Sequence, residues 1–177
     1  MSIFDSPETK FCKQLFKLIC ESKSDPIAHV LCVNKIFYED TATLFPLFTF
    51  GYCMGALDIE FSHRYSTDVC DRLSHKLTDL FTKRIRRELL RPEIIGEARD
   101  RAISEVLILI NDKRSYVSYV LQEEPKEEQL SLISFSYRES LNIKFYDLTS
   151  EVERDLDAAI KFMLDFSVLP FPYPNLR

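Results

Sequence analysis

The side chains best suited to chemistry in this sequence are three histidines and five cysteines, and their spacing gives them no local partners. The histidines are His29, His63 and His75, and no two of them stand four residues apart around a glutamate. No two cysteines form a Cys-x-x-Cys pair, so the common local patterns of a zinc site are missing. We therefore expect no metal and no cofactor, and we assign no catalytic residue.

The cysteines also indicate whether the protein resides in a reducing or an oxidising compartment of the cell. They are odd in number and lie within apolar stretches, at Cys12, Cys20, Cys32, Cys53 and Cys70. Disulfide frameworks of secreted domains pair their cysteines, and an odd set in apolar surroundings is typical of reduced thiols. Lys10, Lys13 and Lys17 interrupt any apolar run near the N-terminus, so no secretory signal is expected. We predict a cytoplasmic, intracellular protein with reduced cysteines.

Glycine is scarce, and its positions are informative. Gly51, Gly55 and Gly96 are the only three, so no Gly-rich phosphate-binding loop can be written. Gly51 and Gly55 stand four residues apart within residues 41–57, which hold no charged residue. That segment is shorter than the roughly 20 apolar residues of a membrane-spanning helix, and Pro46 interrupts it. We predict no membrane span, and a central helix whose glycines allow its neighbours to approach closely.

The same segment has an alternative interpretation as the lining of a ligand pocket. Small-molecule sites are mostly apolar and often aromatic, and small residues leave room for a ligand. The candidate pocket residues are Phe45, Phe48, Phe50, Gly51, Cys53 and Gly55. Under this interpretation the protein is a small-molecule sensor or an enzyme.

A basic cluster is the strongest local charge feature. It consists of Lys83, Arg84, Arg86, Arg87 and Arg91. On a helix most of these residues fall on the side opposite Ile85 and Leu89, which makes the cluster solvent-facing. It can complement the helix dipole, or it can dock an acidic partner. We predict partner binding here and, in the second half of the chain, at Tyr116 and Tyr119.

The charge distribution favours a protein partner. Residues 1–91 carry 13 Lys and Arg against 12 Asp and Glu, whereas residues 92–177 carry 10 against 16. An acidic half is a poor match for a nucleic-acid backbone, so nucleic-acid binding through residues 83–91 is only the third hypothesis. The expected partner is another protein or a second copy of this chain.

The elements that must position these residues begin with helices. Residues 1–91 show helical spacing of apolar residues, with start signals at Ser6-Pro7-Glu8 and Asp25-Pro26 and a long helix from Ser66 to Arg91. A capping box, Ser150-x-x-Glu153, opens a last helix within residues 149–167. The proline-rich residues 168–177 are expected to be extended.

The middle of the chain is predicted to form a sheet. Residues 106–110 are a run rich in β-branched side chains, and residues 133–137 and 141–145 alternate apolar with polar. We therefore predict an antiparallel meander within residues 105–147, and one continuous helix over residues 93–122 is the alternative, because short apolar runs are ambiguous. The predicted fold is a single helix-dominated α+β domain over residues 1–177, with residues 92–148 mostly in strands; the alternative is all-α.

These features together predict a non-enzymatic protein. By elimination of phosphate loops, metal motifs and nucleophile patterns, and from the uneven charge, we expect an intracellular protein-binding module that acts as an adaptor, inhibitor or regulator.

Overall fold

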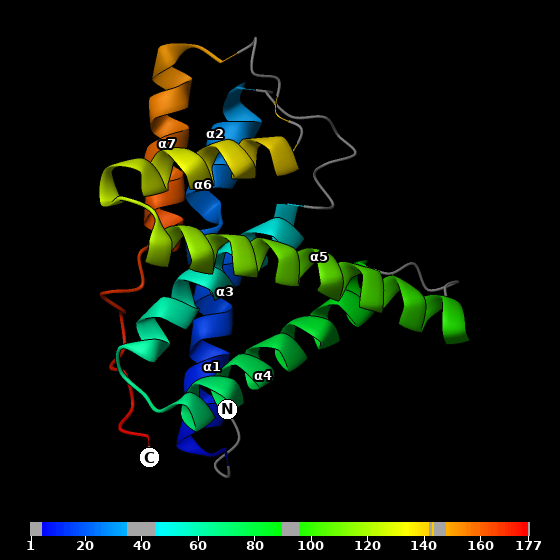
Figure 1. Cartoon of the computed structure of the whole chain (residues 1–177). Helices are drawn as coiled ribbons and strands as arrows, with labels where there is room; N and C mark the ends of the chain where they lie inside the picture. The colour runs from blue at the N-terminus through cyan, green and yellow to red at the C-terminus, as the bar shows by residue number, and fades with distance from the viewer. Residues whose placement is uncertain (1–4, 35–44, 90–95, 142, 144–147, 177) are drawn as a thin grey trace.

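The computed structural model describes residues 5–34, 45–89, 96–141, 143 and 148–176, and every regular element within these ranges is helical (Figure 1). The elements are α1 (Pro7–Lys17), η1 (Leu18–Lys23), α2 (Asp25–Asn34), α3 (Phe45–Ser62), α4 (Thr67–Arg84), η3 (Ile85–Leu89), α5 (Gly96–Glu123), α6 (Lys126–Ser140) and α7 (Ser150–Leu164). The two η elements are short π-helical segments. The fold is all-α.

The predicted α+β class and its antiparallel meander are therefore wrong. α5 takes up the run at residues 106–110, and its buried residues Ile103, Ile110 and Val117 recur every seven residues, which is a helical spacing. In α6 the alternation of residues 133–137 does not match burial, because Phe135 is exposed while Ser134 is buried. Residues 142 and 144–147 of the predicted meander lie outside the described residues.

The structure instead has the long helix that the sequence offered as its alternative. α5 begins at Gly96, whose φ of +59° is a left-handed conformation that glycine adopts without strain. Residues 93–95 of the predicted helix lie outside the described residues.

α3 is the central element of the fold. Every residue from Leu47 to Leu57 is buried, so this helix is covered on all sides as predicted. In Figure 1, α5 crosses in front of α3, and α1, α4 and α7 lie around it. None of the described helices combines the length and the hydropathy needed to cross a membrane.

α3 and α5 share the most extensive contact of any two helices in the described structure. A methyl group added at Gly51 would lie 3.0 Å from the carbonyl oxygen of Ile110. Beside the glycines, the Arg114 guanidinium of α5 makes a two-pronged ion pair with Asp58 of α3, with Nη2–Oδ1 at 2.7 Å. The hydroxyl of Ser118 donates to the Gly55 carbonyl at 3.2 Å. The small residues and this ion pair together hold α5 against α3.

The predicted cap of α1 is confirmed, and the predicted capping residue of α7 is wrong by one position. The Ser6 hydroxyl accepts from the Thr9 amide at 3.2 Å at the start of α1. At α7 the capping residue is Thr149, one residue before the predicted Ser150, and its hydroxyl accepts from the Val152 amide at 3.3 Å. Both caps satisfy an amide that the helix itself leaves unpaired.

The described part of the proline-rich tail, residues 168–176, has no regular secondary structure and packs against the helices. It runs down along α1 in Figure 1. The Phe171 and Tyr173 rings lie 5.9 and 5.6 Å from the Phe11 ring. The Tyr65 hydroxyl donates to the Pro174 carbonyl at 2.9 Å, which ties the end of the tail to the α3–α4 turn.

Candidate functional site

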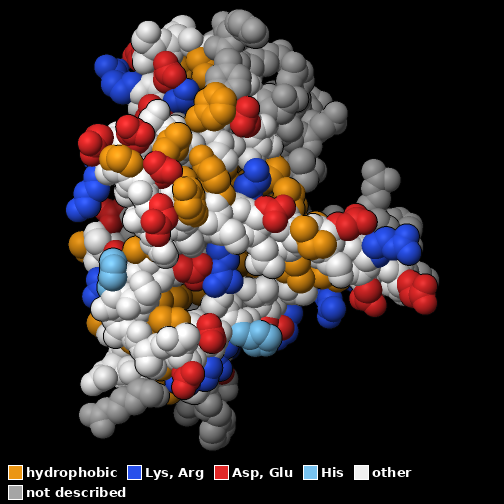
Figure 2. Space-filling model, viewed as in Figure 1, with side chains coloured by type: hydrophobic (Ala, Val, Ile, Leu, Met, Phe, Trp, Pro, Cys, Tyr) orange, Lys and Arg blue, Asp and Glu red, His pale blue; other side chains and the backbone are white. Residues whose placement is uncertain are grey.

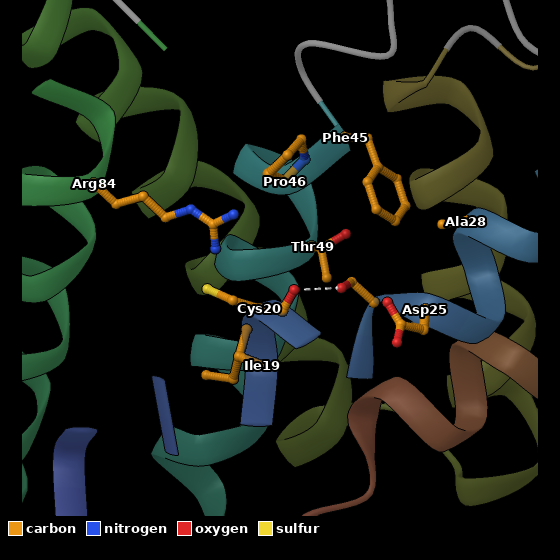
Figure 3. A pocket seen from close by; sticks show the side chains of 9 residues that line it. Ile19, Cys20, Asp25, Ala28, Phe45, Pro46, Thr49 and Arg84 are labelled. Atoms are coloured by element: carbon orange, nitrogen blue, oxygen red, sulfur yellow. Dashed lines mark hydrogen bonds between the residues drawn. The ribbon is translucent and has the colours of Figure 1, made fainter. Parts of the chain in front are cut away.

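A cavity of about 150 Å³ lies where η1, α2, α3 and α4 meet (Figure 3). Its lining residues are Ile19, Cys20, Ser24, Asp25, Ala28, Phe45, Pro46, Thr49 and Arg84. Most of these side chains are apolar or small, and few are charged, which is typical of a small-molecule site.

The π-helical turn η1 shapes one wall of this cavity. α1 runs directly into η1, and α2 follows after Ser24. The Ser24 hydroxyl donates to the Cys20 carbonyl at 2.9 Å, so it provides a partner for a carbonyl in the widened turn (Figure 3). Single π turns occur often at functional sites, because the wider turn displaces side chains from the regular helical positions.

Two opposite charges line the cavity. The Arg84 side chain extends from α4 toward the other lining residues, and Asp25, the first residue of α2, lies on the far side in Figure 3. A neighbouring cavity of about 260 Å³ shares Cys20 and Arg84 and adds Lys17 and Arg87 to its lining. Arg84 thus lies at the boundary of both hollows.

The structure keeps only part of the predicted basic cluster together, because Arg84 and Arg87 both line the cavity of about 260 Å³. Arg84 faces the two cavities, whereas Lys83 is exposed and pairs with Asp79 at 2.6 Å. Arg86 and Arg87 are exposed on η3, where the π turn changes the angular spacing that a regular helix would give them. Arg91 lies outside the described residues.

The predicted pocket residues of α3 are also divided. Phe45 lines the cavity at η1, whereas the other five are buried between helices: Phe48, Phe50, Gly51, Cys53 and Gly55. The Phe50 ring stacks on the Phe81 ring of α4 at 3.9 Å. Burial raises the pKa of the Cys53 thiol, which points toward the Met163 carbonyl of α7 at 3.7 Å.

A second candidate site is an exposed surface on α5 and α6. Tyr119 is 56% exposed, and Ile108, eleven residues or about three turns earlier, is on the same side of α5 and 61% exposed. Phe135 of α6 is 54% exposed. We call Ile108, Tyr119 and Phe135, with the exposed acidic residues near them in sequence, the α5–α6 face; these are Asp112, Glu123, Glu127, Glu128 and Glu139.

The two helices of this face are joined directly. Tyr116, the other predicted partner-binding tyrosine, is half-buried, and its hydroxyl donates to the Leu132 carbonyl of α6 at 3.2 Å. Figure 2 shows apolar side chains gathered over α6 and the adjoining part of α5, with acidic side chains among them. The structure therefore gives Tyr116 a role in helix packing and leaves Tyr119 on the surface.

Lys23 is a buried cation between η1 and α7. Its amine donates to the carbonyls of Phe162, at 2.7 Å, and Asp165, where α7 ends. It also lies over the Phe162 and Phe166 rings, 4.3 and 4.9 Å from their centroids. Burial lowers its pKa. These contacts let Lys23 cap the carboxyl end of α7, where a cation complements the helix dipole.

Sequence reasoning missed several residues of these sites for identifiable reasons. The sequence pattern predicts strands at Ile108 and Phe135, and a strand prediction does not show which side of a helix these residues occupy. Cys20 and Asp25 line the same cavity as Arg84, and apolar spacing in the sequence reveals neither this cavity nor the π turn that contributes Cys20. Within the described residues no group of three His, Cys, Asp or Glu side chains is placed to hold a metal ion.

Comparison with protein-family models, with curated proteins and with solved structures gave no match to this chain.

Proposed function

We propose that this protein is a non-enzymatic, cytoplasmic protein-binding module, and that its α5–α6 face binds a basic amphipathic segment of a partner protein. The observation that carries the proposal is the exposure of Ile108, Tyr119 and Phe135 on two adjoining helices. Large apolar side chains that remain exposed together mark interaction surfaces more often than scattered ones do. Tyrosine and phenylalanine are also enriched at the centres of protein interfaces.

The charges around the face define the partner. Residues 105–140 contain seven Asp and Glu against four Lys and Arg. Two of those four cations are already engaged within the fold, because Arg114 pairs with Asp58 and Arg138 pairs with Glu153 at 2.6 Å. A partner with lysines or arginines flanking an apolar stripe would match this surface, and long-range attraction would speed its association.

A synthetic peptide tests the proposal. The probe is an amphipathic helical peptide with leucines on one face and lysines on the other, and the matched control peptide carries glutamate at each lysine. We expect the full chain to bind the lysine peptide, more weakly at high salt, and to leave the glutamate peptide unbound. Equal binding of both peptides would contradict the proposal.

Variants locate the binding. Tyr119→Ala and Phe135→Ala should each weaken binding by about tenfold, the usual loss at an interface hot spot. Val33→Ala, at a residue 63% exposed on α2, is the control and should leave binding unchanged. Binding that survives both α5–α6 variants would place it elsewhere.

Analytical sedimentation of the protein without peptide tests whether the partner is a second copy of this chain. Concentration-dependent dimers that Tyr119→Ala abolishes would show that the basic partner is this chain itself. Monomers at all concentrations, together with peptide binding, support a different protein as the partner.

A further inference from the structure

α6 is attached to the rest of the fold largely through polar groups. It lies against α5 and α7 at the surface of the molecule (Figure 1). Two of its four buried residues, Ser134 and Arg138, are polar or charged, and the other two are Ile133 and Tyr137. The neighbouring helix α7 differs in this respect, because its buried residues are all apolar: Leu156, Ala159, Ile160 and Met163.

Hydrogen bonds join α6 to α3 and α5. The Tyr137 hydroxyl pairs with the Thr49 hydroxyl of α3 at 2.8 Å, and the Ser136 hydroxyl pairs with the Tyr52 hydroxyl of α3 at 2.7 Å. On α5, the Tyr116 hydroxyl donates to a carbonyl of α6 at 3.2 Å. Each such bond contributes little net stability, because water replaces it when the two groups separate.

A buried cation joins α6 to α7. Arg138 Nη1 lies 2.6 Å from Glu153 Oε1, and Nη2 lies 2.5 Å from Asp157 Oδ1. The Arg138 side chain is only 8% exposed, and its Nε is buried without a hydrogen-bond partner among the described residues. Burial deprives a charge of hydration, and this penalty offsets much of its attraction to its partners. These ion pairs therefore fix the position of α6 without binding it strongly.

We propose that α6 is a docking switch, which detaches as a unit while α3, α5 and α7 stay folded. Detachment returns Arg138 and the hydroxyls to water. The large side chains that it uncovers from full burial are Ile133, Tyr137 and, just after the helix, Leu141. Detachment of α3 would instead expose every residue from Leu47 to Leu57. Because apolar burial is the main source of stability, α6 opens at a smaller cost than the core helices do.

Detachment of α6 would regulate the α5–α6 face. It would carry Phe135 away from Tyr119, so the face is complete only while α6 is docked. This consequence rests on the proposed function, whereas the detachment itself does not. A partner that contacts both helices holds α6 in the docked position, because a ligand shifts an equilibrium toward the state that it binds.

Hydrogen exchange of the full chain, followed by mass spectrometry, tests the detachment. After correction for intrinsic rates, the amides of α6 should exchange at least about tenfold faster than those of α3 and α7. Low urea concentrations should barely change the exchange of α6, since its opening exposes little surface. Exchange of α6 at the same corrected rate as α3 would overturn the proposal, because both helices would then open only with the whole fold.

Two variants of α7 test the role of the ion pairs. Asp157→Asn weakens the hold on Arg138, so α6 should exchange about tenfold faster while α3 is unchanged. Asp155→Asn is the matched control, because Asp155 is 56% exposed and lies 4.0 Å from Arg154 of the same helix. It should leave the exchange of α6 unchanged. Equal effects of the two variants, or equal acceleration of α3 and α6, would contradict the proposal.

A milder variant keeps the test available if Asp157→Asn fails to fold. Ser136→Ala removes one hydroxyl partner of Tyr52 and should accelerate the exchange of α6 by about fivefold, again without a change in α3. Equal acceleration of both helices would count against a separate opening of α6.

The lysine peptide described above tests the link to the α5–α6 face. Its binding should slow the exchange of α6, and the glutamate peptide should leave this exchange unchanged. Binding that does not slow the exchange of α6 would refute the regulatory link. A lysine peptide that does not bind refutes the proposed function instead, and the exchange of the chain alone then still decides whether α6 detaches.

Discussion

Gly55 lies directly against Val117: a methyl group added at position 55 would be 2.6 Å from the Cβ of Val117 and 2.6 Å from the backbone carbonyl of Arg114. No real pair of such atoms lies that close, so α5 can pack at this distance only because residue 55 has no side chain. The close packing of α3 and α5 thus depends on one hydrogen atom in place of a methyl group.

Gly55→Ala should therefore destabilise the protein. Alanine gains about 1 kcal/mol of helix propensity over glycine, but overpacking against backbone that cannot move aside costs roughly 1–3 kcal/mol or more. We expect a net loss of about 1–2 kcal/mol in the free energy of unfolding, measured by urea titration. Gly51→Ala, with its nearest contact at 3.0 Å, should lose less. A more stable Gly55→Ala variant would contradict this packing.

The Asp58–Arg114 ion pair should contribute measurably to the α3–α5 contact. The side chains of Arg114 and Asp58 are 28% and 25% exposed, so solvent screens them only partly. A double-mutant cycle with Asp58→Asn and Arg114→Gln should give a coupling energy of about 1–2 kcal/mol. The exposed Lys83–Asp79 pair, at 68% and 52%, is the control and should give about 0.5 kcal/mol or less. Equal coupling energies in the two cycles would contradict the prediction that the less exposed Asp58–Arg114 pair contributes more than the exposed Lys83–Asp79 pair.

The packed tail should stabilise the fold through Tyr173. Besides its contact with Phe11, the Tyr173 ring lies 4.1 Å from the Arg64 guanidinium carbon, and its hydroxyl donates to the Phe166 carbonyl at 2.5 Å. Tyr173→Ala should cost about 2 kcal/mol and lower the Tm. Val168→Ala in the same tail, at a side chain 81% exposed, should leave the Tm unchanged. Identical Tm values for the two variants would show that the tail is detached in solution.

Cysteine reactivity should follow burial. Cys32 is exposed, whereas Cys12 and Cys53 are buried, and burial raises the pKa of both buried thiols. At neutral pH, a disulfide reagent should label Cys32 at once and label Cys12 and Cys53 at least about a hundredfold more slowly, because these two react only when the structure opens. In urea all five should react. Rapid labelling of Cys53 in the folded protein would contradict the packing of α3.

Alkaline pH should weaken the fold through the same burial. Burial raises the pKa of Cys12 from 9.0 to about 12, so the folded chain holds this proton more tightly than the unfolded chain does. The corresponding stability is fully present below about pH 9 and is lost as the pH rises toward about 12. Lys23 acts in the opposite direction, because its pKa is lowered and the unfolded chain holds its proton more tightly.

The measurement is the free energy of unfolding in urea at pH 8 and pH 10.5. Cys12 alone should account for a loss of roughly 1–2 kcal/mol between these values. Cys12→Ala should show a smaller loss over the same range, although its stability at pH 8 is lower because of the cavity it leaves. Unchanged pH dependence in this variant would assign the loss to other groups.

The sequence by itself determined where several helices start and which segment is central. The Ser6 cap depends only on residues within one turn, so local sequence specifies it. The absence of charge over residues 41–57 likewise favours a position away from water, and residues 47–57, in α3, are all buried. Local chemistry and hydropathy suffice for such features.

Tertiary structure decided the class of the fold. The runs at residues 106–110 and 133–137 are compatible with strand or helix by composition, and their state depends on what they pack against. Gly51 and Gly55 offer a groove that fits a helix backbone, so the segment that crosses them is stable as α5. Phe135 then remains on the surface, and Ser134 is buried where its hydroxyl donates to Asp157.

The residues of the two candidate sites are also brought together only by the tertiary structure. Arg84 and Asp25 are far apart in sequence and line one cavity because η1, α2, α3 and α4 pack around it. Tyr119 and Phe135 are exposed on two helices, α5 and α6, that contact each other through Tyr116 and Leu132. Sequence gives the charge and polarity of each side chain, and packing between elements decides which of them share a site.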